Sequence, residues 1–332
     1  MPMNENTKPA PDAAPLPSLE KKIALIFPGQ GSQTVGMGRD LYEQLPIAKA
    51  TFDEADEALG FSLSGLCFNG PEETLKQTEH TQPAILTMSI AVARVLSAHG
   101  ISAALTAGHS LGEYSAHVAA GTLSFADAVR TVRSRGQFMQ RAVPAGMGTM
   151  AAVLALPAER IADLCAQASS ETNSAVAPAN LNSPDQTVIS GATAGVERAA
   201  ELCREAGAKR VVMLPVSAPF HCSLMQPAAE KLAVALEAVN LSDPRFPVAC
   251  NVDARMIVRR GEVIDTLVRQ VTGAVRWVEC IELLKSSGAT HFVEAGPGRV
   301  LTGLMRQIDR TQNAMNVEDV ASLDKTLAAL AP

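Results

Sequence analysis

The chain has 332 residues, of which 47% are hydrophobic and 19% charged, a balance that argues for a folded globular protein. This length allows one large domain or two. Lysine and arginine number 28 against 34 acidic residues, and the net charge of −6 excludes a generally basic nucleic-acid-binding protein. Only 4% of the residues are aromatic, with Trp277 the sole tryptophan, which argues against stacking platforms for bases or sugars.

The first 21 residues are rich in proline and alanine, and we expect them to form a flexible tail. They contain no apolar run of about 7–15 residues such as a signal peptide needs, and we expect no membrane-spanning segment elsewhere. The six cysteines are far apart, without a C-x-x-C pair, and no H-E-x-x-H motif occurs. These features predict a cytoplasmic protein with reduced thiols, no bound metal and no contact with membranes or nucleic acid.

The first part of the chain alternates short apolar runs with helical patterns. The runs at 23–27 and 103–107 are typical of buried parallel strands, and the first leads into a Pro-Gly turn. Ser124, with Asp127 three residues later, resembles a helix-capping box. This alternation indicates an α/β domain built on a parallel sheet. Helices are predicted at 38–60, 82–99, 111–120 and 125–142.

The pattern changes between residues 147 and 215. Its expected order is the β-α-β-β-α-β arrangement of ferredoxin-like folds. Helices and one strand follow from Gln226, so we predict a large α/β-hydrolase-like domain of residues 22–146 and 216–332 with a small inserted subdomain at 147–215. Within the insertion we expect strands at 149–156, 175–179, 186–190 and 210–215 and helices at 158–168 and 195–206.

A G-x-S-x-G motif is formed by Gly108, Ser110 and Gly112, between a short apolar strand and a helix. In a nucleophile elbow, the sharp strand-to-helix turn presents the serine above the sheet edge, and the glycines leave room for that backbone. The N-terminus of the following helix offers free N–H groups to a developing oxyanion, the first of them at Leu111. The alternative is an ordinary helix-capping serine, but the strand–turn–helix context favours a nucleophile.

A serine nucleophile needs a base, and His221 is the candidate because it lies on a predicted loop after the last strand of the insertion. The alternative is a structural histidine. His109 adjoins Ser110, but neighbouring side chains around an elbow usually point apart. No carboxylate stands out as a third triad member, so a backbone carbonyl is expected to orient the base and form a dyad.

Arg135 is predicted on the apolar face of its helix. With about 100° per residue, it lies within about 60° of Val132 and Met139 and about 160° from Arg133. An arginine on a buried face requires an anion, because unpaired burial costs several kcal/mol. The anion is either an internal Asp or Glu or, as we favour, a substrate carboxylate held by two hydrogen bonds.

Two glycine-rich turns, at 29–33 and 296–301, could be interpreted as phosphate cradles. They lack the lysine of a P-loop and the G-x-G-x-x-G spacing, so structural turns are the favoured interpretation.

Seven blocks across residues 27–304 together resemble the malonyl-CoA:acyl-carrier-protein transacylase family, the acyltransferases of type II fatty-acid synthesis. That family combines an α/β-hydrolase-like core with a ferredoxin-like insertion, in agreement with the expectation from the residues. The blocks occur in the order FPGQGSQTVGMG (27–38), TQPAIL (81–86), GHSLGEYSA (108–116), RGQFMQ (135–140), NLNSPDQTVISG (180–191), APFHCSLM (218–225) and EAGPGRVLTGL (294–304).

The resemblance implies catalytic roles for five positions. Ser110 would be the acylated nucleophile and His221 its general base and acid. The backbone N–H groups of Gln30 and Leu111 would form the oxyanion hole. The carbonyl of Gln270 would orient His221, which would account for the missing acid.

The resemblance also implies that Arg135 binds the malonyl carboxylate. Two residues depart from the family pattern: Ala274 stands where a proline is common, and His117 replaces an apolar residue on the elbow helix. We expect His117 to be a hydrogen-bonded, non-catalytic histidine. Further implied pocket positions are Asn180, Asn182, Gln82 and Met139.

The predicted function is transfer of a malonyl group from malonyl-CoA to the phosphopantetheine thiol of acyl carrier protein, through a malonyl-serine and without a cofactor. The alternatives are a serine esterase or thioesterase, a malonyl transferase of a polyketide pathway, and a non-catalytic subunit that binds the carrier protein. We expect a monomer. Because carrier proteins are typically acidic, a local basic surface is expected, with candidates Lys209, Arg210, Arg259, Arg260 and Arg299.

Overall fold

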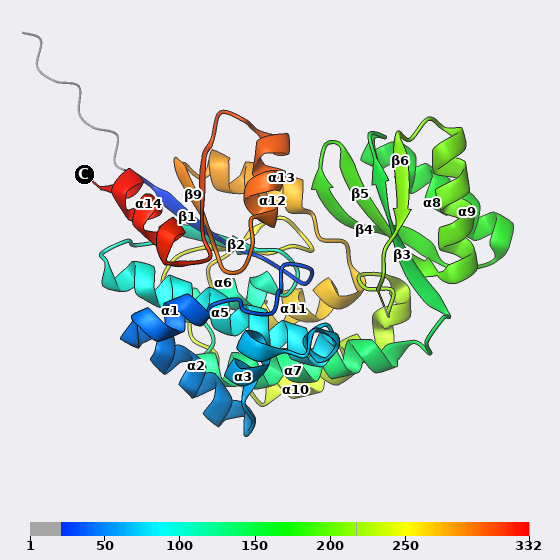
Figure 1. The fold of residues 1–332 in the computed structure, drawn as a ribbon. Helices are drawn as coiled ribbons and strands as arrows, with labels where there is room; N and C mark the ends of the chain where they lie inside the picture. Colours follow the sequence, from blue (N-terminus) through cyan, green and yellow to red (C-terminus); the bar gives the residue numbers. More distant parts are fainter. Residues whose placement is uncertain (1–20, 217, 332) are drawn as a thin grey trace, which may run out of the picture.

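The computed structural model describes residues 21–216 and 218–331, so the predicted tail lies outside the described residues except for Lys21. Two sheets organise this part of the chain (Figure 1). The first has six strands in the order β10-β9-β1-β2-β7-β8, with β8 antiparallel to β7 and the other neighbours parallel. Its strands are β1 (Ile23–Phe27), β2 (Leu105–Gly108), β7 (Val248–Ala249), β8 (Met256–Ile257), β9 (His291–Ala295) and β10 (Asn313–Val317).

Every residue of β1 is buried, because helices cover both faces of this sheet. Alternate residues serve two cores: Leu25 and Phe27 pack with one set of helices, and Ala24 and Ile26 with the other. In Figure 1 the larger set lies below the sheet and α12 and α13 lie above it. The helices of this domain are α1 (Arg39–Gln44), α2 (Pro46–Leu59), α3 (Leu63–Asn69), α4 (Glu72–Leu75), α5 (Thr78–Ala98), α6 (Gly112–Ala119), α7 (Phe125–Ala142), α10 (Gln226–Glu237), α11 (Val263–Thr272), α12 (Trp277–Ser286), α13 (Val300–Ile308) and α14 (Val320–Leu330), with 3₁₀ turns at Ser223–Met225 and Arg260–Glu262.

The second sheet is antiparallel, in the order β4-β5-β3-β6, and the helices α8 and α9 pack on it around a core of their own. This order and connectivity confirm the predicted ferredoxin-like arrangement, whereas the domain boundaries stay predictions. A bridge between Asn180 and Val275 joins the sheet to the large domain. The elements are β3 (Gly148–Leu154), α8 (Ala158–Thr172), β4 (Val176–Ser183), β5 (Gln186–Ala192), α9 (Thr193–Glu205) and β6 (Arg210–Met213).

Four expectations about individual elements were wrong. The helix predicted at 38–60 is two helices, because Leu45 precedes Pro46 and adopts an extended conformation. Helix α5 begins at Thr78, before the expected residue 82, and α3 and α4 were not predicted. After Gln226 the chain forms four strands instead of one, and two of them have only two residues each, too few for a recognisable pattern.

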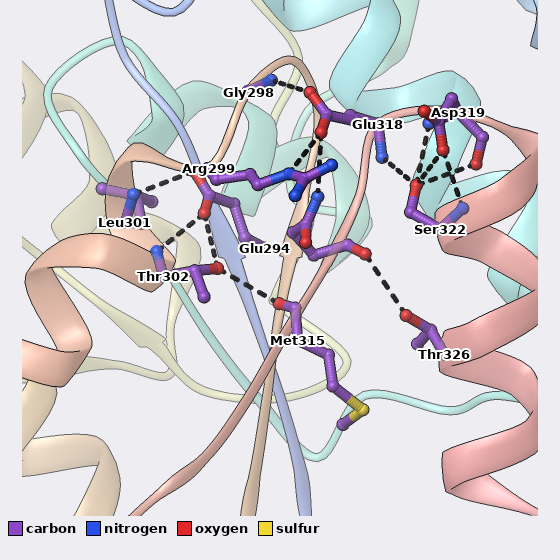
Figure 2. Close-up of polar contacts among 11 residues, drawn as sticks. Glu294, Gly298, Arg299, Leu301, Thr302, Met315, Glu318, Asp319, Ser322 and Thr326 are labelled. Atoms are coloured by element: carbon purple, nitrogen blue, oxygen red, sulfur yellow. Dashed lines mark hydrogen bonds and ion pairs between the residues drawn. The ribbon is translucent and has the colours of Figure 1, made fainter. Parts of the chain in front are cut away.

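Helix α13 is held to the sheet by a buried carboxylate (Figure 2). Glu294, on β9, accepts hydrogen bonds from the backbone N–H of Leu301 at 2.9 Å and from the N–H and hydroxyl of Thr302, each at 2.7 Å. These N–H groups belong to the first turn of α13, where a helix lacks internal acceptors and favours an anion. The turn at 296–301 is therefore structural, since the protein's own carboxylate occupies the anion position.

Candidate active site

Ser110 lies at a strained turn between β2 and α6, with a φ of 51°. A Cβ on Gly108 would lie 1.8 Å from the carbonyl carbon of Gly112, and a Cβ on Gly112 would lie 2.1 Å from the carbonyl oxygen of Phe27. Neither position can accept a side chain without a backbone shift. The predicted strand–turn–helix elbow is present, and Ser110 provides no cap to α6.

Asn251, which sequence reasoning missed, spans the elbow. Its Oδ1 accepts from the backbone N–H of Ser110 at 2.7 Å, and its Nδ2 donates to the carbonyl of Gly108 at 2.8 Å. The residue follows β7 and is fully buried. In the sequence, the one signal for this role was that Asn251 is a polar residue directly after a short apolar run at 248–250. Its two bonds stabilise a backbone conformation that costs about 1–3 kcal/mol.

The hydroxyl of Ser110 meets His221, as predicted. The distance from Ser110 Oγ to His221 Nε2 is 2.7 Å, and His221 Nδ1 lies 2.8 Å from the backbone oxygen of Gln270. A carbonyl oxygen only accepts, so Nδ1 carries the hydrogen and Nε2 accepts from the serine. Gln270 is in the last turn of α11, where a carbonyl has no helical partner. The expected dyad is present, with a carbonyl in place of a triad acid.

Burial, together with the positive charge of Arg135, lowers the pKa of His221 to about 3. The imidazole is therefore neutral at physiological pH and able to take a proton from the serine. Ser110 and His221 both have a positive φ, 51° and 59° respectively. Strained backbone at two facing functional groups is typical of a site whose geometry the surrounding fold imposes.

Arg135 is only 1% exposed and its guanidinium is bound by neutral groups. Nη1 donates to Oε1 of Gln82 at 2.8 Å, and Nη2 donates to Oε1 of Gln270 at 2.9 Å and to Ser110 Oγ at 3.3 Å. Among the described residues, no carboxylate forms a salt bridge with it, which removes the structural salt bridge as an explanation. A buried guanidinium beside the serine is ready to bind an anion that the substrate supplies.

A cavity of about 130 Å³ lies in front of the dyad. It is small, which suits a short acyl group, and Leu111 lines it at the N-terminus of α6, where N–H groups lack helical acceptors. Of the residues predicted from sequence, those that line the cavity are Gln30, Gln82, Ser110, Leu111, Arg135, Met139, Asn180 and His221.

Two predicted residues contact the site from behind its lining. Gln270 binds Arg135 and His221, and Asn182 Oδ1 accepts a hydrogen bond from His109 Nε2 at 2.8 Å. His109 itself lines the cavity, and its ring bonds Asn182 instead of Ser110 or His221. Its ring also packs edge-on against Trp277, with the ring centres 5.5 Å apart.

Behind the arginine lies a second missed residue, Glu113. Its Oε2 accepts from Gln270 Nε2 at 2.7 Å and from the backbone N–H of Asn251 at 2.9 Å. Burial raises its pKa to about 7, against the lowering influence of these bonds and of Arg135. The residue belongs to the GHSLGEYSA block, but a glutamate in the first turn of a helix gave no signal of burial.

The expectation that His117 would be hydrogen-bonded was wrong. The residue is completely buried, and neither ring nitrogen has a hydrogen-bond partner in the described part of the chain. Burial lowers its pKa to about 3, so the ring is neutral.

Over residues 21–216 and 218–331, no three His, Cys, Asp or Glu side chains come together as metal ligands, and no helix has the length and apolarity needed to cross a membrane. All six cysteines are free and buried.

The acyl transferase domain family matches residues 24–328. The malonyl CoA-acyl carrier protein transacylase of Bacillus subtilis is 50% identical over 309 residues, 93% of this chain and 97% of the relative. The structure of an acyl carrier protein S-malonyltransferase from Vibrio cholerae is 49% identical, with a TM-score of 0.90 over 92% of this chain and 100% of that one. A malonyl-transacylase in complex with its type II PKS acyl-carrier protein is 46% identical, with a TM-score of 0.90 over 93% and 100% of the two chains.

These matches span nearly all of the described residues. The chain belongs to the malonyl CoA-acyl carrier protein transacylase family.

Proposed function

We propose that Ser110 carries the malonyl group between malonyl-CoA and acyl carrier protein, with His221 as the proton carrier and Arg135 as the group that selects the acyl chain. The activity is that of an [acyl-carrier-protein] S-malonyltransferase, which supplies fatty-acid synthesis and needs no cofactor. The observation that carries the assignment of residues is a buried guanidinium without a carboxylate partner, 3.3 Å from the serine hydroxyl.

In the first half-reaction, His221 Nε2 takes the proton as Ser110 Oγ attacks the thioester carbonyl. The tetrahedral oxyanion is stabilised by the N–H groups of Leu111 and Gln30, each worth about 10²–10³ in rate. The carbon–sulfur bond then breaks, and the imidazolium returns its proton to the coenzyme A thiolate. A malonyl ester remains on Ser110.

In the second half-reaction, the phosphopantetheine thiol of the carrier protein gives its proton to His221 and attacks the ester. The serine oxygen leaves and recovers that proton. The same two residues thus act in the reverse order, which gives ping-pong kinetics. The carbonyl of Gln270 at the C-terminal end of α11 stabilises the imidazolium, because that end of a helix favours positive charge.

Arg135 distinguishes malonyl from acetyl groups. A charged hydrogen bond to a carboxylate is worth about 1.5–3 kcal/mol, and a bidentate pair adds geometric specificity.

The same elbow occurs in serine esterases and thioesterases, but that alternative predicts a triad acid and no buried arginine. Here a backbone carbonyl holds His221, and a guanidinium lies beside the serine. A non-catalytic subunit would have no need of the 2.7 Å contact between Ser110 and His221.

We propose that the enzyme acts as a monomer in the cytoplasm and meets the acidic carrier protein with a basic surface. The side chain of Arg299 is bound to Glu318, whereas in the described residues no ion pair is formed by the side chains of Lys209, Arg210, Arg259 and Arg260. The six reduced cysteines support a reducing compartment. The second candidate function is malonyl transfer in a polyketide pathway, and it is supported by the relative whose structure was solved with a polyketide carrier protein.

Mass spectrometry of the protein mixed with malonyl-CoA tests the proposal. We expect a gain of about 86 Da on Ser110, removed rapidly by holo carrier protein and slowly by water, as for a covalent transfer intermediate. The Ser110→Ala variant should show no gain. An unmodified wild-type protein would overturn the proposal, and rapid loss to water would favour the hydrolase.

A further inference from the structure

The charge on Arg135 needs compensation before substrate arrives. The guanidinium is buried, and its hydrogen-bond partners Gln82, Gln270 and Ser110 are all neutral. A buried cation without a counter-charge costs several kcal/mol. The free enzyme must therefore either leave this cost in place or hold a negative charge close by.

One amide joins Arg135 to a buried acid. Gln270 accepts from Arg135 through Oε1 at 2.9 Å and donates to Glu113 through Nε2 at 2.7 Å. Glu113 is fully buried on the elbow helix. The side chain of Gln270 therefore connects the cation and the carboxylate in a single chain of hydrogen bonds.

One carboxylate oxygen of Glu113 is free to bind a proton. Its Oε2 has two donors, whereas Oε1 is buried and has no hydrogen-bond partner among the described residues. Two N–H donors on one oxygen stabilise an ionised carboxylate, and a bare second oxygen can take a proton without breaking a bond.

The other titratable groups around Glu113 hold fixed charge states near neutral pH. Burial raises the pKa of Tyr114, Cys250 and Cys280, so they are neutral, and lowers that of His221. Asp253 is held ionised because Arg269 lowers its pKa. Among these neighbours, Glu113 alone has a pKa displaced to about 7.

We propose that Glu113 is the counter-charge of Arg135 in the free enzyme and takes up a proton from solvent when a substrate carboxylate occupies the arginine. The acyl carboxylate then replaces Glu113 as the partner of the cation, and the buried site keeps the same net charge. This inference rests on the proposed function, in which Arg135 binds the malonyl carboxylate.

The sign of the pH effect follows from linkage. The positive charge of Arg135 lowers the pKa of Glu113, so a carboxylate on the arginine raises it and the bound state holds more protons. Malonyl-CoA binding therefore weakens as pH rises above about 7, by at most about tenfold per pH unit. Acetyl-CoA has no carboxylate, and its binding should lack this dependence.

Calorimetry of the Ser110→Ala variant, which cannot be acylated, measures the protons directly. Malonyl-CoA and acetyl-CoA are each titrated at pH 7.5 in phosphate and in Tris, whose different ionisation enthalpies report proton exchange. We expect about half a proton more to be taken up with malonyl-CoA than with acetyl-CoA. The two ligands share the coenzyme A moiety, so the difference isolates the carboxylate.

A matched pair of variants assigns the proton. Ser110→Ala/Glu113→Gln should lose the extra uptake, whereas Ser110→Ala/Glu294→Gln, altered at a second fully buried glutamate, should keep it. The inference would be overturned if the extra proton uptake persisted in the Glu113 variant, or if malonyl-CoA bound selectively without extra uptake. Either result would leave the proposed function standing. Equal affinity for the two ligands would instead overturn the proposed role of Arg135.

Discussion

Two glutamates, Glu113 and Glu294, are fully buried in the described part of the chain, and their surroundings differ. Glu294 lies at the N-terminus of α13 with three hydrogen-bond donors shared over both oxygens (Figure 2). Glu113 has two donors on one oxygen and none on the other, with a buried arginine one amide away. Burial raises the pKa of both.

The difference separates a structural carboxylate from a functional one. At Glu294 the free N–H groups of a helix meet a permanent anion, so both partners are satisfied by the fold. Glu113 has one carboxylate oxygen without a hydrogen-bond donor among the described residues. Its counter-charge, Arg135, is also the group that binds the substrate carboxylate in the proposed function. Sites that break local rules of polar satisfaction are expected where function requires it.

The largest effect that sharpens this contrast is on stability. Glu294→Gln turns an amide NH₂ toward N–H donors on α13, and we expect a loss of about 2–3 kcal/mol in the free energy of unfolding. At pH 6, where Glu113 with its pKa of about 7 is protonated in the native state, Glu113→Gln keeps an acceptor for Asn251 and Gln270 and places its NH₂ at the bare position, so we expect a change within about 1 kcal/mol. Urea denaturation of the two isosteric variants at the same pH measures both changes in the free energy of unfolding. Equal losses would contradict the distinction between a structural and a functional carboxylate.

A smaller effect concerns His117, a buried titratable residue whose ring nitrogens have no hydrogen-bond partner among the described residues. His117→Leu removes an unsatisfied ring, and we expect it to stabilise the protein by about 1–2 kcal/mol at pH 8.

The gain should grow as pH falls from about 6.5 toward 3. The unfolded state binds a proton in that window while the folded ring, with its pKa near 3, does not, so the native protein loses stability that the variant keeps. The added difference at pH 5 is about 2 kcal/mol, measured by urea unfolding at the two pH values. A variant less stable than wild type at both would show that the ring has a partner.

Much of the site could be predicted because its signals are local. The elbow depends on the spacing of Gly108, Ser110 and Gly112, and the inward face of Arg135 follows from helical periodicity. The ferredoxin-like insertion was also predictable, since its strands and helices are regular and follow one another along the chain.

The missed residues depend on distant contacts. Asn251 and Glu113 act through a loop after a two-residue strand that meets the elbow only in the folded chain. The lack of hydrogen-bond partners for the His117 ring in the described residues likewise depends on which residues surround it in the folded chain. Pro46 was a local signal that should have divided the first helix.

The most direct test of the account is the acyl selectivity of Arg135→Ala, measured as kcat/KM for malonyl and acetyl transfer on the same preparation. We predict that malonyl transfer falls by about 10²-fold or more, about 3 kcal/mol, because the carboxylate loses its charged partner. Acetyl transfer should fall far less, and it controls for damage to the fold. An equal fall for both acyl groups would contradict the claim that this buried arginine selects the substrate.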